Sequence, residues 1–128
     1  MPPADARQAL GRRGEALAAA YLQAHGCRLV TANWRPGAGG RGEIDLVVYD
    51  GPALVIVEVR TRRGGPVGLA EESVDRGKQQ RLIALALAYL QAASLPEATD
   101  WRIDVVTVHL VDGRPPIVTW LRGAVEEG

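Results

Sequence analysis

The chain has 128 residues, of which 47% are hydrophobic and 23% charged, and its formal net charge at pH 7 is +0. This length and composition predict one soluble globular domain. The zero net charge also excludes a uniformly basic nucleic-acid-binding protein. The charge is uneven, because residues 1–63 hold nine bases and six acids, whereas residues 64–128 hold six bases and nine acids. The first half is therefore the one suited to phosphates.

Cysteine usage and hydropathy limit the remaining classes. Cys27 is the only cysteine, so the chain has no internal disulfide and no cysteine-rich zinc site, and we expect Cys27 to be a small buried residue. The apolar runs are too short for a transmembrane span, and no secretory signal is recognisable. These features predict a cytoplasmic protein with no membrane partner.

Hydrophobic periodicity and turn residues predict two helices and five strands in the order α-β-β-β-α-β-β. The predicted elements, in chain order, are a helix at 4–25, strands at 28–34, 43–49 and 53–62, a helix at 73–93, and strands at 102–111 and 116–121. Gly26 is expected to end the first helix and Ser73 to cap the second. A helix between two strands indicates a crossover. We therefore expect a single α/β domain over residues 1–128, with its core at about 8–121 and a mixed central sheet flanked by helices.

Three carboxylates interrupt the apolar strands of the predicted hairpin. Glu43 and Asp45 fall in its first strand and Glu58 in its second. Burying a carboxylate without a partner costs several kcal/mol. Side chains on a strand alternate between faces, so Glu43 and Asp45 share one face of the first strand. A divalent cation held by these acids is one explanation for their position.

The hairpin turn decides which acids face each other. A two-residue Gly51-Pro52 loop, or a four-residue loop at 50–53, places Asp45 opposite Glu58. A two-residue Asp50-Gly51 turn places Glu43 opposite Glu58 instead. Each of these registers keeps the three carboxylates on one face, where like charges repel unless a cation or a neighbouring arginine relieves them.

The residues around these acids fit metal-assisted phosphodiester hydrolysis. Oxygen ligands of this kind hold Mg²⁺ or Mn²⁺, which activates water and stabilises charge on phosphoryl oxygens. Arg60 lies two residues after Glu58, so both side chains share a face and can reach the same phosphate. The spacing of Asp45, Glu58 and Arg60 alone occurs often by chance. Its position in two adjacent apolar strands makes it a more specific signal for a metal-dependent site.

Several blocks occur in an order that resembles a known family. They are Gly14-Glu15, Asn33-Trp34-Arg35, Gly42-Glu43-Ile44-Asp45-Leu46, Val57-Glu58-Val59-Arg60-Thr61-Arg62, Lys78-Gln79-Gln80-Arg81-Leu82 and Arg102-Ile103-Asp104-Val105-Val106. They resemble the YraN-like family of uncharacterised bacterial proteins, whose fold is the restriction-endonuclease-like PD-(D/E)xK core. The resemblance spans roughly residues 11–110.

The resemblance implies a metal-dependent endonuclease that hydrolyses DNA phosphodiester bonds. Asp45 and Glu58 would bind Mg²⁺ or Mn²⁺, with Glu43 nearby and Glu15 reaching in from the first helix as a further catalytic residue. The similarity to Holliday-junction resolvases implies branched or structured DNA in repair or recombination as the substrate, and a homodimer as the assembly. A shared fold does not by itself fix the function.

Arg60 departs from the family pattern, which has lysine at this place. A guanidinium stays protonated and cannot act as a general base, although it can donate hydrogen bonds to a phosphate. Two interpretations of the chain therefore remain: a working endonuclease, or a non-catalytic nucleic-acid-binding domain that retains the fold. In a third, the protein is structural, and Arg60 and Arg62 hold the acids as ion pairs.

Basic residues near the motif are the predicted contacts for nucleic acid. They are Arg35, Arg41, Arg62, Arg63 and Lys78. A single surface arginine more commonly does no more than solvate the surface. Lys78, the only lysine of the chain, either lies solvated on the second helix, which is the commoner role, or supplies an amine to the site. Asp104 is expected to be structural.

Overall fold

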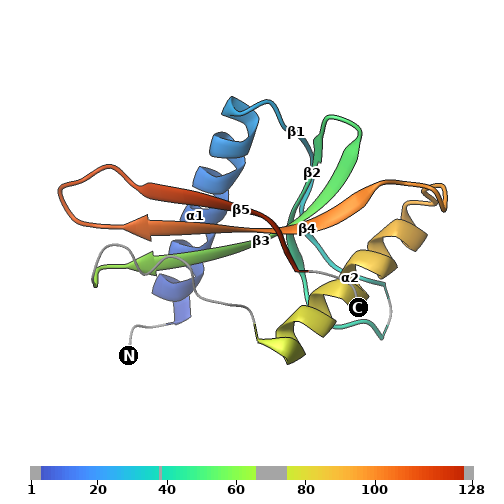
Figure 1. The fold of residues 1–128 in the computed structure, drawn as a ribbon. Coiled ribbons are helices and arrows are strands. Elements are labelled where there is room, and N and C mark those ends of the chain that lie inside the picture. Colours follow the sequence, from blue (N-terminus) through green and yellow to red (C-terminus); the bar gives the residue numbers. More distant parts are fainter. Residues whose placement is uncertain (1–3, 38, 66–74, 126–128) are drawn as a thin grey trace.

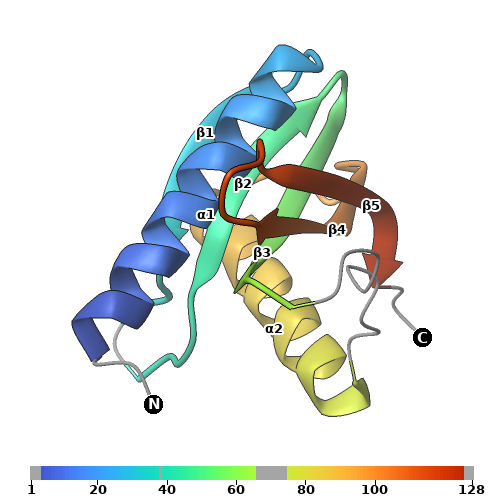
Figure 2. The same ribbon diagram turned by 90° about the vertical axis from the view of Figure 1, so that its left-hand side faces the viewer.

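Five strands form one sheet that has a helix on each face (Figures 1 and 2). The computed structural model describes residues 4–37, 39–65 and 75–125. Its elements, in chain order, are α1 (Ala4–Ala24), β1 (Arg28–Trp34), β2 (Ile44–Asp50), β3 (Ala53–Arg63), α2 (Arg76–Ala92), β4 (Trp101–Leu110) and β5 (Ile117–Val125). This confirms the predicted order of elements and the single α/β domain. Neither helix, within the part of the chain that the structure describes, is long and apolar enough to cross a membrane.

The sheet is mixed, as the sequence predicts. Its strands lie in the spatial order β1-β2-β3-β4-β5. The β3–β4 pair is parallel, and the other three pairs are antiparallel. Helix α2 makes the crossover that the parallel pair requires. This arrangement is compatible with a restriction-endonuclease-like core.

Each face of the sheet is buried against one helix. The cluster under α1 contains Ala18, Leu22, Leu46, Val48, Val55 and Val57. The cluster under α2 contains Leu82, Leu85, Tyr89, Val47, Ile56 and Ile103. Because both faces are covered, the central strands are continuous apolar runs, and a polar side chain within them stands out. Cys27 is buried in the α1 cluster, as expected.

The hairpin register is one of those that the sequence allows. Asp50 pairs with Ala53 and Tyr49 with Leu54, so the loop is Gly51-Pro52. Gly51 has a φ of 59°, a backbone conformation that glycine adopts without strain. The ladder runs to the pair formed by Leu46 and Val57. Continued by one residue, the same register places Asp45 opposite Glu58, at the point where β2 and β3 part.

Two predicted boundaries are wrong by more than one residue. Helix α2 begins at Arg76 rather than at residue 73, and its N-cap is Asp75, whose Oδ1 accepts a hydrogen bond of 2.8 Å from the backbone N–H of Lys78. The predicted cap, Ser73, lies outside the described residues. Strand β5 continues to Val125 rather than ending at 121, because an irregularity near Gly123, which has a φ of 61°, lets the strand pair again with Ile103.

Candidate metal centre

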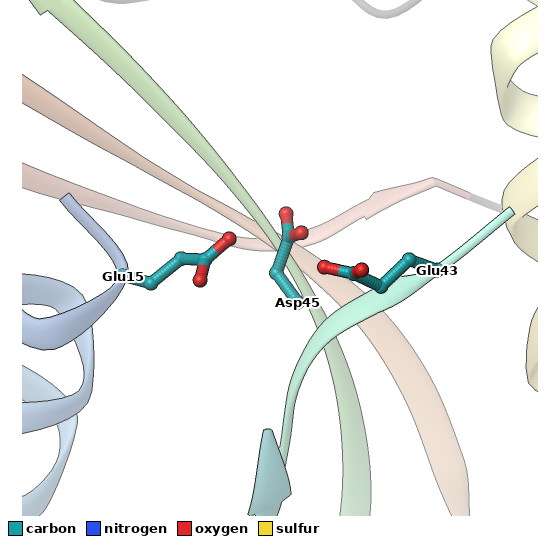
Figure 3. Close-up of side chains that lie close together, drawn as sticks. All are labelled: Glu15, Glu43 and Asp45. Carbon is teal, nitrogen blue, oxygen red and sulfur yellow. The ribbon is translucent and has the colours of Figure 1, made fainter. Parts of the chain in front are cut away.

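Three carboxylates meet between the two helices, near the first residues of β2 (Figure 3). Figure 3 shows Glu15 projecting from α1 toward Asp45, with Glu43 approaching from the other side. One carboxylate oxygen from each lies within 4.8 Å of the others, and all three residues are half-buried. Oxygen ligands at this spacing suit a hard divalent cation. The structure thus brings together Glu15, Glu43 and Asp45, which are 30 residues apart in the chain at most.

Asn33 joins two members of this cluster. Its Nδ2 donates to Glu15 Oε1 at 3.0 Å and to Glu43 Oε1 at 2.8 Å. Asn33 has a φ of 55°, a left-handed conformation that is uncommon outside glycine and is enriched for asparagine. Strained backbone at such a place points to a function for the side chain. The sequence analysis did not assign Asn33 to the site, although Asn33 stands in one of the blocks that carry the family resemblance.

Asp45 is held in a position that disfavours its charge. Its Oδ2 accepts a hydrogen bond of 2.8 Å from the backbone N–H of Val59. Burial, hydrogen bonding with Glu58, and repulsion from Glu58 and Glu15 raise the pKa of Asp45 from 3.8 to about 8, against the opposing effect of the Val59 N–H. A cation bound between the acids would favour the charged form and reverse this shift.

Glu58 contacts both the acidic cluster and α2. Its side chain is 13% exposed, and its Oε2 lies 3.3 Å from Lys78 Nζ. Because the Asp75 cap fixes the first turn of α2, the position of Lys78 is set by the fold. Lys78 is thus paired with Glu58 although its side chain is 37% exposed, and its role of supplying an amine to the site stays a prediction.

The remaining predicted basic residues are spread over several places. Arg35 Nη2 lies 2.9 Å from Glu43 Oε2, although the Arg35 side chain is 75% exposed. Arg60 is half-buried on β3. Arg62 Nη2 lies 3.5 Å from Nδ1 of His109, near the end of the sheet. Arg35 therefore contacts Glu43 of the acidic cluster directly.

The other predicted basic residues, Arg41, Lys78 and Arg63, line two different cavities. A cavity of about 670 Å³ is lined by Glu43 and Glu58 together with Arg41 and Lys78. A smaller cavity of about 140 Å³ holds Arg63 with Arg13 and Arg114. Arg41 and Lys78 are thus placed beside the acids, whereas Arg63 lies in a different cavity.

Asp104 has the structural role that the sequence predicts. It is completely buried and accepts hydrogen bonds from Arg102 Nε at 3.0 Å, Trp120 Nε1 at 2.9 Å and the backbone N–H of Gly123 at 2.8 Å. Arg102 Nη2 also bonds Asp50 Oδ2 at 2.7 Å. This network ties β5 and β2 to β4.

Known proteins match this chain over most of its length. The model of the uncharacterised protein family UPF0102 matches residues 14–108. The chain belongs to this family. This confirms the resemblance to the YraN-like family. A UPF0102 protein of Herpetosiphon aurantiacus is 49% identical over 117 residues, which cover 89% of this chain and 92% of that protein. One from Pseudomonas savastanoi pv. phaseolicola is 40% identical over 129 residues, covering 97% and 98%.

The UPF0102 match contains the whole candidate site. It begins at Gly14, directly before Glu15, and ends within β4. Gly14 lies where α1 crosses β3, and a Cβ there would overlap the side chain of Thr61. This close approach fixes where Glu15 leaves the helix. In this UPF0102 chain, the Gly14-Glu15 pair therefore combines a packing residue with a site residue.

Proposed function

We propose that this UPF0102 protein is a metal-dependent endonuclease that hydrolyses phosphodiester bonds of DNA. The observation that carries the proposal is the convergence of Glu15, Glu43 and Asp45 within 4.8 Å, with Glu58 beside them. The raised pKa of Asp45 supports it: burial is the main cause, hydrogen bonding with Glu58 and repulsion from Glu58 and Glu15 add to it, and a divalent cation among these acids would favour the charged form.

The residues present fit Mg²⁺ or Mn²⁺. Glu15, Glu43 and Asp45 offer carboxylate oxygens, and Glu58 lies close enough to Asp45 to add another. When bound, such an ion supplies a water of lowered pKa and positive charge next to the phosphoryl oxygens.

Side chains around the acids have their own roles in the proposed reaction. Asn33 holds Glu15 and Glu43 in one orientation through its amide. The backbone N–H of Val59 orients Asp45. Lys78 and Arg60 donate hydrogen bonds to oxygens of the reacting phosphate and stabilise the charge that develops there. Arg60 does this without exchanging a proton, because a guanidinium remains protonated.

The test is cleavage of a panel of DNA structures with purified protein in Mg²⁺, Mn²⁺ or EDTA. The panel contains supercoiled plasmid, linear duplex and four-way junctions. We expect metal-dependent cleavage that falls at least about 100-fold in Glu43→Gln and Asp45→Asn. Glu97→Gln, the same change at an exposed position away from the acids, should leave cleavage unchanged. Absence of cleavage of every substrate with both metals would refute the proposal.

A second candidate function is a nucleic-acid-binding domain that retains the fold without cutting. Arg60, in the place of the family's lysine, is the observation that favours it. This candidate requires salt-sensitive DNA binding that survives Asp45→Asn and no turnover in the native chain. Arg60→Lys separates the two candidates, because cleavage that appears only in this variant would show that the arginine had disabled a working site.

A further inference from the structure

The cavity of about 670 Å³ beside the acids has a lining that phosphodiester hydrolysis alone does not explain. We propose that it binds one unpaired nucleotide of the DNA strand, with the base against α2 and the phosphate beside Lys78. This inference rests on the proposed function and specifies its substrate, which is DNA with an unpaired nucleotide next to the phosphodiester that is cut.

The lining has a polar part and an apolar part. Glu43 and Glu58 link the cavity to the metal centre, and the cations Arg41, Lys78 and Arg81 surround it. The apolar part consists of Pro36, Leu82, Ala84, Leu85 and Ala88. A nucleotide carries the matching groups, since it joins a flat base that packs on apolar side chains to a phosphate that pairs with cations.

The two walls of the cavity leave space for a single nucleotide. One wall is α2, and the other is formed by Pro36 and by residues 40–43, a segment that lies beside that helix (Figure 1). A volume of 670 Å³ is in the range of small-ligand pockets, which hold one nucleotide but no duplex. A base that remains paired carries its partner strand with it, so a nucleotide must leave the stack to enter.

The shape of the cavity depends on a glycine. Gly42 has a φ of 89°, and a Cβ built on it would lie 3.1 Å from Leu85 Cδ1. Only glycine readily combines this backbone conformation with such close contact. The approach of the loop to α2 is therefore specified by the sequence.

The charges favour a nucleotide over other anionic ligands. Lys78 and Arg81 are three residues apart on α2 and both line the cavity, and Arg41 lines it from the loop. Glu43 and Glu58 would repel an acidic peptide that filled the whole cavity. The single phosphate of a phosphodiester can contact the cations without filling the acidic part of the cavity. A metal ion held by the acids would attract this phosphate further.

Binding of a fluorescently labelled single-stranded DNA oligonucleotide in EDTA tests the inference without cleavage. Ala84→Trp fills the cavity from an exposed helix position, so the fold should tolerate it, and circular dichroism checks that it does. We expect this variant to bind at least about tenfold more weakly. Leu87→Trp is the matched control, because Leu87 is 46% exposed on the same helix and does not line the cavity. Equal affinity of the two variants would overturn the inference.

A charge variant gives a second, independent readout. Arg81→Gln removes one cation from the cavity and should reduce the slope of log affinity against log salt by about 0.7 for single-stranded DNA. Arg76→Gln, on the same helix and outside the lining, should leave that slope unchanged. Equal slopes in the two variants would contradict the proposed position of the phosphate.

The outcome for the cavity can be separated from the outcome for the nuclease. Weakened oligonucleotide binding in Ala84→Trp, with no cleavage by the native chain, would support the cavity and refute the nuclease. Cleavage of blunt duplex and of overhanging DNA at equal rates, unaffected by Ala84→Trp, would refute the cavity and support the nuclease.

Discussion

Replacing Asp45 by asparagine should stabilise the protein at pH 8 when no metal is present. The folded protein holds a proton on Asp45 up to a pKa of about 8, whereas the reference value is 3.8. Between these pH values the folded state binds more protons than the unfolded state, so the free energy of unfolding decreases as pH rises. Asparagine does not titrate, and its side-chain oxygen can still accept the hydrogen bond from Val59.

The magnitude follows from the size of the shift. Each pKa unit corresponds to about 1.4 kcal/mol, so a shift from 3.8 to about 8 has an upper limit of roughly 6 kcal/mol. Asp45 is only half-buried, and water and salt at its exposed side screen the repulsion. We therefore expect Asp45→Asn to raise the free energy of unfolding by about 2 kcal/mol at pH 8.

Urea unfolding in EDTA, followed by tryptophan fluorescence, measures this difference. The gain should be present at pH 8, shrink as the pH is lowered, and approach zero near pH 4, where Asp45 is protonated in the folded state and half-protonated in the unfolded state. Asp100→Asn makes the same chemical change at an exposed position and serves as the control. The reasoning is refuted if Asp45→Asn gives no gain at pH 8, or a gain that grows toward low pH.

Three further substitutions test other parts of the structure. Asn33→Gly keeps the left-handed backbone and removes the side-chain amide that bonds Glu15 and Glu43. The affinity for Mn²⁺, measured by calorimetry, should fall about 10- to 100-fold. Unchanged affinity would show that the amide does not orient the acids. Gly14→Ala should cost about 2 kcal/mol of stability because its Cβ overlaps Thr61, and a midpoint of urea unfolding equal to that of the native chain would contradict this packing. Asp104→Ala leaves donors such as the half-buried Trp120 indole without an acceptor and should cost about 3–5 kcal/mol, whereas a loss below about 1 kcal/mol would rule out the network.

Much of the fold follows from local sequence signals. Period-two alternation and the turn residues specify the strands, and the helix between β3 and β4 specifies the crossover. The sequence leaves more than one hairpin register open, and the structure selects the Gly51-Pro52 loop. Each hairpin register that the sequence allows keeps Asp45 and Glu58 on one face of the sheet. The sequence therefore predicts that these two side chains share a face, but it does not predict which residues pair across the hairpin.

The parts that the sequence did not predict depend on contacts between distant elements. The approach of Lys78 to Glu58 depends on how α2 lies on the sheet, which helical periodicity does not determine. The role of Asn33 depends on a left-handed residue in β1 and on two acids from other elements. The extra length of β5 depends on Gly123, whose backbone donates to the buried Asp104. In each case the deciding partner lies at least 10 residues away in the chain.

Anomalous diffraction from a crystal soaked in Mn²⁺ is the most direct test of the central claim, which is that the acidic cluster holds a catalytic divalent cation. We expect one strong peak among the carboxylates of Glu15, Glu43 and Asp45, with manganese–oxygen distances of about 2.0–2.4 Å. The peak should disappear in Asp45→Asn. A crystal in which Mn²⁺ binds only elsewhere, or not at all, would contradict the claim.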